Sequence, residues 1–135
     1  MAVTVTARRR EGYVHDVDIE GRHSMVFDEP EDSGGTDTAA SPTSVLAAAL
    51  AACTAITVEM YADRKEWDLG DLAVEVEMNT DDAARSRSFV VTLRLPGGLT
   101  EEQLEKLRVI AGKCPVHRAL SHETQVTIED RVAPL

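Results

Sequence analysis

The sequence is poor in cysteine, and that shortage excludes one class of protein. Among its 135 residues there are two cysteines, Cys53 and Cys114. Two are too few for the disulfide framework of a small secreted protein. In a reducing cytosol such a pair is either structural and reduced or redox-active.

Long hydrophobic runs are also missing. No stretch reaches the length of about 18 apolar residues that a membrane-spanning helix needs, and the most apolar segment, 45–56, is too short. The first ten residues, MAVTVTARRR, lack the apolar core of a signal peptide. We therefore expect a cytoplasmic, soluble protein with no membrane partner.

Positive charge is scarce as well. Lys and Arg number 14 against 24 Asp and Glu, which gives a net charge of −10. Such a chain repels the phosphates of nucleic acid, and the one basic cluster, at positions 8–10, is no nucleic-acid footprint. The only lysines are Lys65, Lys106 and Lys113. An acid-rich, lysine-poor surface would suit a high-salt cytoplasm, which we keep as a hypothesis about the source.

What is present predicts one globular domain over 1–135. Apolar and polar residues alternate in AVTVTARRR and YVHDVDIE, so we predict N-terminal strands within 2–29. The acidic, aperiodic segment 30–41 is predicted to be a loop, long enough to suspect a functional role. Ser41 as N-cap and Pro42 as first helical residue predict the start of a central helix over 42–65.

The central helix is predicted to carry Cys53 on its packed face. Apolar or small residues recur every three or four positions, which is the rhythm of a buried helical stripe. The members of this predicted stripe are Leu46, Ala49, Leu50, Cys53, Ile56, Thr57 and Met60. Alanines widen the apolar surface, so both sides of the helix can be covered.

After the helix, alternating residues predict a strand pair within 71–96. Thr100, followed three positions later by Gln103, is a capping box that predicts a second helix over 100–120. A closing strand is predicted over 123–130.

Each cysteine falls on the apolar stripe of its own predicted helix, so the two sulfurs can approach each other when the helices pack. Structural burial is the simpler interpretation, because free cysteine packs as a small hydrophobe. A zinc site of Cys53, Cys114 and His117 is a third interpretation. Structural zinc usually needs four ligands at paired short spacings, and the other histidines fit no such pattern, so we predict no metal.

Two motifs resemble a known family. The stretch SPTSVLAAALAACTAITVEMYADRK and the later stretch FVVTLRLPGGLTEEQLEKLRVIAGKCPVHRAL are similar to the osmotically inducible protein C (OsmC) and organic hydroperoxide resistance proteins. The resemblance covers nearly the whole chain in order. It implies an α+β fold of antiparallel sheets with a long central helix. It also implies a homodimer of two intertwined chains, with the sites at the interface.

The resemblance also implies roles for the cysteines. Cys53 matches the peroxidatic cysteine and Cys114 the resolving one. The implied substrate is an organic hydroperoxide and the implied reductant a dithiol or lipoyl-type donor, with no cofactor. A thiolate attacks the peroxide oxygen to give a sulfenic acid, and a neighbouring thiol converts that acid to a disulfide.

A cation is needed to ionise such a thiol, because an ordinary cysteine with a pKa of about 8.5 is mostly protonated at neutral pH. The family's peroxidases use an arginine of the N-terminal hairpin, held by a glutamate just after the helix-starting proline. Arg10 is the nearest match and Arg22 the second candidate. The glutamate is missing, since Thr43 and Ser44 follow the proline.

The sequence is therefore compatible with two functions. The first is a thiol-dependent peroxidase that reduces organic hydroperoxides through Cys53 and Cys114 in oxidative-stress defence. The second is an OsmC-like protein without peroxidase activity, which binds a small apolar ligand or serves as an interaction module.

Overall fold

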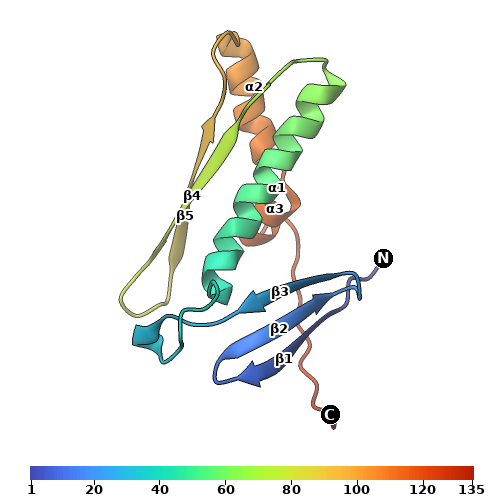
Figure 1. The fold of residues 1–135 in the computed structure, drawn as a ribbon. Helices are drawn as coiled ribbons and strands as arrows, with labels where there is room; N and C mark the ends of the chain where they lie inside the picture. The colour runs from blue at the N-terminus through green and yellow to red at the C-terminus, as the bar shows by residue number, and fades with distance from the viewer. The chain divides into compact units, whose positions relative to one another are not determined.

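The first unit of the chain, Met1–Ala47, is built on three strands. The structure is a computed structural model that describes residues 1–135. Strands β1 (Val5–Glu11), β2 (Val14–Ile19) and β3 (His23–Phe27) form an antiparallel sheet in that order (Figure 1). Gly12 turns the chain between β1 and β2 at a φ of 55°, a conformation that glycine adopts without strain.

The loop after β3 is organised around one buried carboxylate. Asp28 is 1% exposed. Its Oδ1 accepts the backbone N–H of Glu29 at 2.8 Å. Its Oδ2 accepts the backbone N–H groups of Thr36 and Thr38 at 3.2 and 3.1 Å, and their hydroxyls at 2.6 and 2.9 Å. These bonds hold the pKa of Asp28 well below its ordinary value. The segment is therefore ordered, with a single 3-10 turn, η1 (Glu31–Ser33).

The long helix α1 (Pro42–Arg64) begins as predicted but packs on a different face. The Oγ of Ser41 accepts the N–H of Ser44 at 3.3 Å, which is an N-cap. The buried residues are spaced by four: Leu50, Thr54, Val58 and Ala62. Ile56 and Met60, members of the predicted stripe, are 54% and 61% exposed. The predicted stripe is correct for Leu50, which is buried, and wrong for Ile56 and Met60. This alanine-rich helix is apolar all round, so its period does not single out one face.

By length and composition alone, α1 is also the one helix of the chain that could cross a membrane. Its polar residues interrupt every continuous apolar run, which is why the sequence prediction counted only a short segment. Length and composition alone are weak evidence for a membrane span, because the core helix of a soluble protein can have the same length and composition. Only 22% of its most apolar window is buried within this chain, and the other residues are half-buried or exposed.

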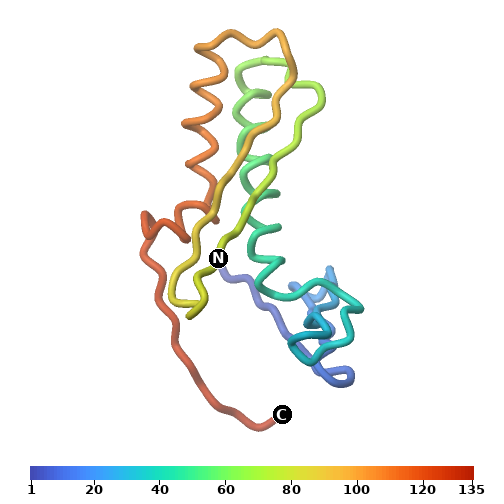
Figure 2. The backbone as a smooth tube through the Cα atoms, turned by 90° about the vertical axis from the view of Figure 1, so that its left-hand side faces the viewer, coloured from blue at the N-terminus to red at the C-terminus, as the bar shows by residue number.

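The second unit, Ala48–Leu135, packs a hairpin beside helices. Strands β4 (Ala73–Thr80) and β5 (Arg87–Arg94) pair antiparallel, and α2 (Glu101–Ala111) follows. Figures 1 and 2 show the hairpin alongside α1 and α2, which run in opposite directions. The buried core lies between these elements and consists of Val58, Ala62, Leu69, Leu107 and Ala111. The α+β fold with antiparallel sheets and a long central helix is confirmed.

The chain ends differently from the expectation. After the short helix α3 (Pro115–Leu120), residues 123–130 form no strand. A strand requires a neighbour that completes its hydrogen-bond ladder, and these residues have no such ladder in the single chain.

Candidate functional site

Two thiols meet where α1 faces the junction of α2 and α3. Cys53 lies midway along α1, and Cys114 lies in the short turn between α2 and α3. Both cysteines are free thiols, and Cys114 lies close enough to Cys53 to raise the pKa of the Cys53 thiol. Cys114 is fully buried, whereas Cys53 keeps part of its surface exposed. The two cysteines therefore differ in exposure to solvent.

The N-terminus of α3 supplies polar contacts to both sulfurs. Cys114 is the N-cap of this helix, and its Sγ accepts the backbone N–H of His117 at 3.4 Å. The backbone N–H of Val116 lies near Cys53 and acts to lower the pKa of its thiol. The first N–H groups of a helix have no partner within it, so these donors are free for the sulfurs. The sequence signal for this turn was Pro115 directly after Cys114, a good first residue of a helix.

The surroundings of Cys53 favour the neutral thiol. Burial raises the pKa of Cys53, and the hydrogen bond to the Cys114 thiol raises it further. The Val116 N–H and the Thr57 hydroxyl act in the opposite direction but do not reverse the shift. All these groups belong to the second unit. Their combined effect leaves Cys53 mostly protonated at neutral pH, so thiolate chemistry here needs an added cation.

The predicted arginines both belong to the first unit. Arg10, on β1, donates from Nε to Oδ2 of Asp16 at 3.1 Å, and this pair raises the pKa of Arg10 and lowers that of Asp16. Arg22, in the turn before β3, donates to Glu20 at 3.1 Å. Each guanidinium therefore has a carboxylate partner within its own unit, and the role of either at Cys53 stays a prediction.

His117 also lines a small cavity. Its volume is about 190 Å³, and Leu50, Arg87, Phe89 and His117 contribute to its lining. The Nδ1 atom of His117 is buried and has no hydrogen-bond partner. The sequence favoured a histidine that caps the helix end or bonds a carbonyl and did not indicate a buried Nδ1 without a partner. No three His, Cys, Asp or Glu side chains gather closely enough to hold a metal ion.

The family model described as OsmC-like protein matches residues 35–129, which include both cysteines and all of α1. The chain belongs to the OsmC-like family. Arg10 and Arg22 lie before the matched region, so the family match does not extend to them.

Solved structures share the fold of this OsmC-like chain at low identity. An osmotic stress induced and detoxification response protein from Psychrobacter arcticus has a TM-score of 0.76 and 22% identity, covering 86% of each chain. The organic hydroperoxide resistance protein OsmC from Legionella pneumophila has a TM-score of 0.65 and 23% identity, covering 89% of each chain. OhrB of Bacillus subtilis has a TM-score of 0.58 and 23% identity, covering 88% of this chain and 90% of its own. No curated protein sequence matches significantly.

Proposed function

We propose that this OsmC-like chain is a thiol peroxidase that reduces organic hydroperoxides, with Cys53 as the attacking and Cys114 as the resolving thiol. The observation that carries the proposal is the pair of neighbouring free thiols, Cys53 partly exposed and Cys114 buried. Similarity to proteins named for organic hydroperoxide resistance supports the same chemistry.

The proposed reaction has two steps. The Cys53 thiolate attacks the distal peroxide oxygen, so that an S–O bond forms, the O–O bond breaks and the alcohol leaves with a proton. The sulfur of Cys114 then attacks the sulfenic sulfur, which forms the disulfide and releases water. A dithiol or lipoyl-type donor, by the same thiol–disulfide exchange, would return both sulfurs to thiols.

Activation of Cys53 is assigned to an arginine of the N-terminal hairpin, Arg10 first and Arg22 second. The raised pKa of Cys53 creates the need for a cation. Because Thr43 and Ser44 follow Pro42, no glutamate at the start of α1 holds that arginine. Asp16, which already pairs with Arg10, is available for this positioning role.

We further propose that two copies form a cytoplasmic homodimer. Ile56 and Met60 lie on the side of α1 away from its buried residues and remain exposed in the single chain. A second copy would cover this apolar face. Glu59, charged and on the same exposed side of the helix, disfavours a lipid environment.

The second candidate is an OsmC-like protein without peroxidase activity, which binds a small apolar ligand or serves as an interaction module. Two observations favour it: the raised pKa of Cys53 and the missing glutamate after Pro42. A thiol that stays protonated reacts slowly with peroxides.

The number of free thiols left after treatment with a peroxide distinguishes the two candidate functions. The reduced protein is treated with a slight excess of cumene hydroperoxide, and free thiols are titrated over time. A peroxidase loses both thiols rapidly and stoichiometrically, with one peroxide consumed for each chain. Thiols that stay inert would reject the peroxidase and leave the binding protein as the better description.

A further inference from the structure

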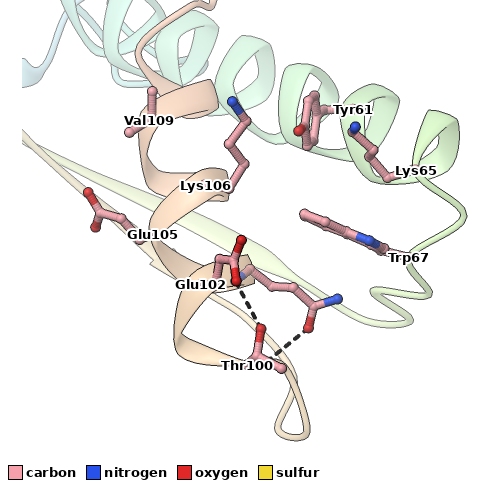
Figure 3. A pocket seen from close by; sticks show the side chains of 9 residues that line it. Tyr61, Lys65, Trp67, Thr100, Glu102, Glu105, Lys106 and Val109 are labelled. Carbon is pink, nitrogen blue, oxygen red and sulfur yellow. Dashed lines mark hydrogen bonds between the residues drawn. The ribbon is translucent and has the colours of Figure 1, made fainter.

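A second concave surface lies away from the thiols, between the C-terminal end of α1 and the N-terminal half of α2. Its volume is about 740 Å³, within the range of about 300–1,000 Å³ typical of small-molecule sites. Figure 3 shows Tyr61, Lys65 and Trp67 on one side and Glu102, Lys106 and Val109 on the other. Neither cysteine lines it. We refer to it as the α1–α2 groove.

The aromatic part of the groove is fixed by its packing. The rings of Tyr61 and Trp67 meet edge to face, with centroids 5.7 Å apart. Both residues pack against the buried core around Leu107, which fixes their positions. Each residue is only half-buried, so part of it remains exposed. A fixed aromatic surface of this kind accepts a flat apolar group at little cost in conformational entropy.

The charges of the groove do not match those of the rest of the molecule. Two of the three lysines of this acidic chain meet here, with Nζ atoms 5.7 Å (Lys65) and 5.8 Å (Lys106) from the centre of the Tyr61 ring. Neither lysine forms an ion pair with any of the 24 acidic residues. Two ammonium groups therefore flank one aromatic ring without a carboxylate partner.

The acidic residues of the groove do not cancel this charge. Glu105 is occupied by Arg108, which donates to both of its carboxylate oxygens at 2.9 and 2.6 Å. Glu102 remains as the one carboxylate of the groove without an ion pair. Two unpaired ammonium groups against one unpaired carboxylate leave an excess of one positive charge, which suits a monoanion better than a multiply charged ligand.

We propose that the α1–α2 groove is a binding site for a planar aromatic carboxylate. Its ring lies against Tyr61 and Trp67, and its carboxylate is held by Lys65 and Lys106. The site is separate from the thiol chemistry, so it does not depend on the proposed peroxidase activity. An aromatic carboxylate combines the two features that the groove offers together, an aromatic surface and unpaired cations.

The single tryptophan of the chain makes the test direct. Trp67 gives one indole N–H resonance in a nitrogen-15 correlation spectrum. The full-length protein is titrated with biphenyl-4-carboxylate and, separately, with the uncharged biphenyl-4-carboxamide. We expect a saturable shift of the indole resonance with the carboxylate and at least fivefold weaker binding of the amide.

Lysine variants test the assigned contacts. Lys65→Gln and Lys106→Gln should each weaken carboxylate binding about three- to fivefold, the scale of an exposed charge pair, and the effect should shrink at high salt. Lys113→Gln is the matched control, since it removes the same charge from the one lysine outside the groove, and should bind as the unmodified protein does.

Three results would contradict the proposed binding site. No saturable shift, equal binding of the amide, or equal weakening by Lys113→Gln would overturn the proposal. Cys53→Ser should bind the carboxylate as the unmodified protein does. Loss of peroxidase activity and loss of carboxylate binding are therefore caused by different substitutions and can be told apart.

Discussion

At the scale of single residues, exposure separates the two thiols. Cys53 is partly open to solvent, whereas Cys114 is closed off completely. A hydroperoxide arriving from solvent meets Cys53 first and reaches Cys114 only if the packing opens. Cys114 is nevertheless close enough to raise the pKa of Cys53, and the proposed resolving role depends on this closeness.

Replacing each cysteine by serine should therefore give different products. Cys53→Ser should abolish consumption of cumene hydroperoxide. Cys114→Ser should consume one equivalent and stop at a sulfenic acid, because the second thiol is needed only to resolve it. Peroxide consumed per chain, with mass spectrometry after dimedone labelling, measures both results. Equal loss of the first turnover in the two variants would contradict the assigned roles.

The activating cation is tested by the reactivity of Cys53. If Arg10 stabilises its thiolate, Arg10→Ala should raise the pKa of Cys53 further. Alkylation by iodoacetamide at pH 7 should then slow by about tenfold, the effect of one unit in the pKa of a mostly protonated thiol. Following the rate from pH 6 to 10 gives the pKa directly.

Arg22→Ala is the matched variant for that experiment, because it removes the same charge from the other candidate. A change in the pH profile with Arg22→Ala alone would move the role to Arg22. An unchanged profile in both variants would mean that no hairpin arginine activates Cys53, and structural burial would become the better interpretation of the pair.

The closeness of the two thiols could be predicted from the sequence, whereas the groups around them could not. Regular spacing on two helices allowed Cys53 and Cys114 to be predicted as neighbours. The N–H donors of Val116 and His117 and the buried Nδ1 of His117 depend on the angle at which α3 leaves Cys114. That angle is set by tertiary packing, which no local pattern encodes.

At the scale of elements, the loop after β3 depends on Asp28. Its two oxygens accept hydrogen bonds from Glu29, Thr36 and Thr38. The carboxylate thus satisfies backbone N–H groups that have no partner in a strand or helix. The turn is closely packed: a Cβ atom on Gly35 would lie 1.9 Å from the carbonyl oxygen of Glu29. This arrangement holds the chain that leads into α1.

Asp28→Asn should destabilise the loop at neutral pH. Both carboxylate oxygens act as acceptors, so the amide NH₂ of asparagine would face an N–H or hydroxyl donor in either orientation. We expect a lower urea midpoint and faster proteolysis within 30–41. Asp32→Asn, an exposed residue of the same loop, is the control for loss of charge and should change neither.

The same carboxylate predicts a pH dependence. The pKa of Asp28 in the folded chain lies below its ordinary value of 3.8, so ionised Asp28 adds stability above that pH. This contribution is lost as the pH falls below about 4 toward the lowered folded pKa. Urea midpoints measured from pH 7 to pH 3 should fall less in Asp28→Asn than in the unmodified protein. Parallel curves would contradict the linkage.

Elements set by local chemistry were predictable, and those that need a partner were not. The capping box of Thr100 and Gln103 is confirmed, because both of its hydrogen bonds lie within four residues. The strand expected at 123–130 is not formed in the single chain, since a strand depends on a neighbouring edge. The face of α1 could not be chosen locally, because an apolar helix can pack on either side.

At the scale of the whole molecule, apolar surface remains uncovered in each of the two units. In the first unit, Val5 and Met25 are exposed on β1 and β3. In the second unit, Ile56 and Met60 form the uncovered face of α1. Apolar patches of this kind on a soluble chain mark interaction surfaces. The long helix thus has one face used within the chain and one face left for a partner.

A second copy of the chain is the partner we predict, and it should be required for folding. Burying the exposed parts of Ile56 and Met60, 54% and 61%, would contribute roughly half of the 1.5–3 kcal/mol that full burial of such a side chain is worth. Light scattering at micromolar concentration should give the mass of two chains, and the urea midpoint should rise with protein concentration, because unfolding and dissociation are then one process. Ile56→Lys should abolish the dimer or lower its unfolding midpoint sharply, whereas Leu104→Lys, 39% exposed on α2, should leave both measurements nearly unchanged. A stable monomer of the unmodified chain at this concentration would contradict the prediction and leave the open face of α1 for a different partner.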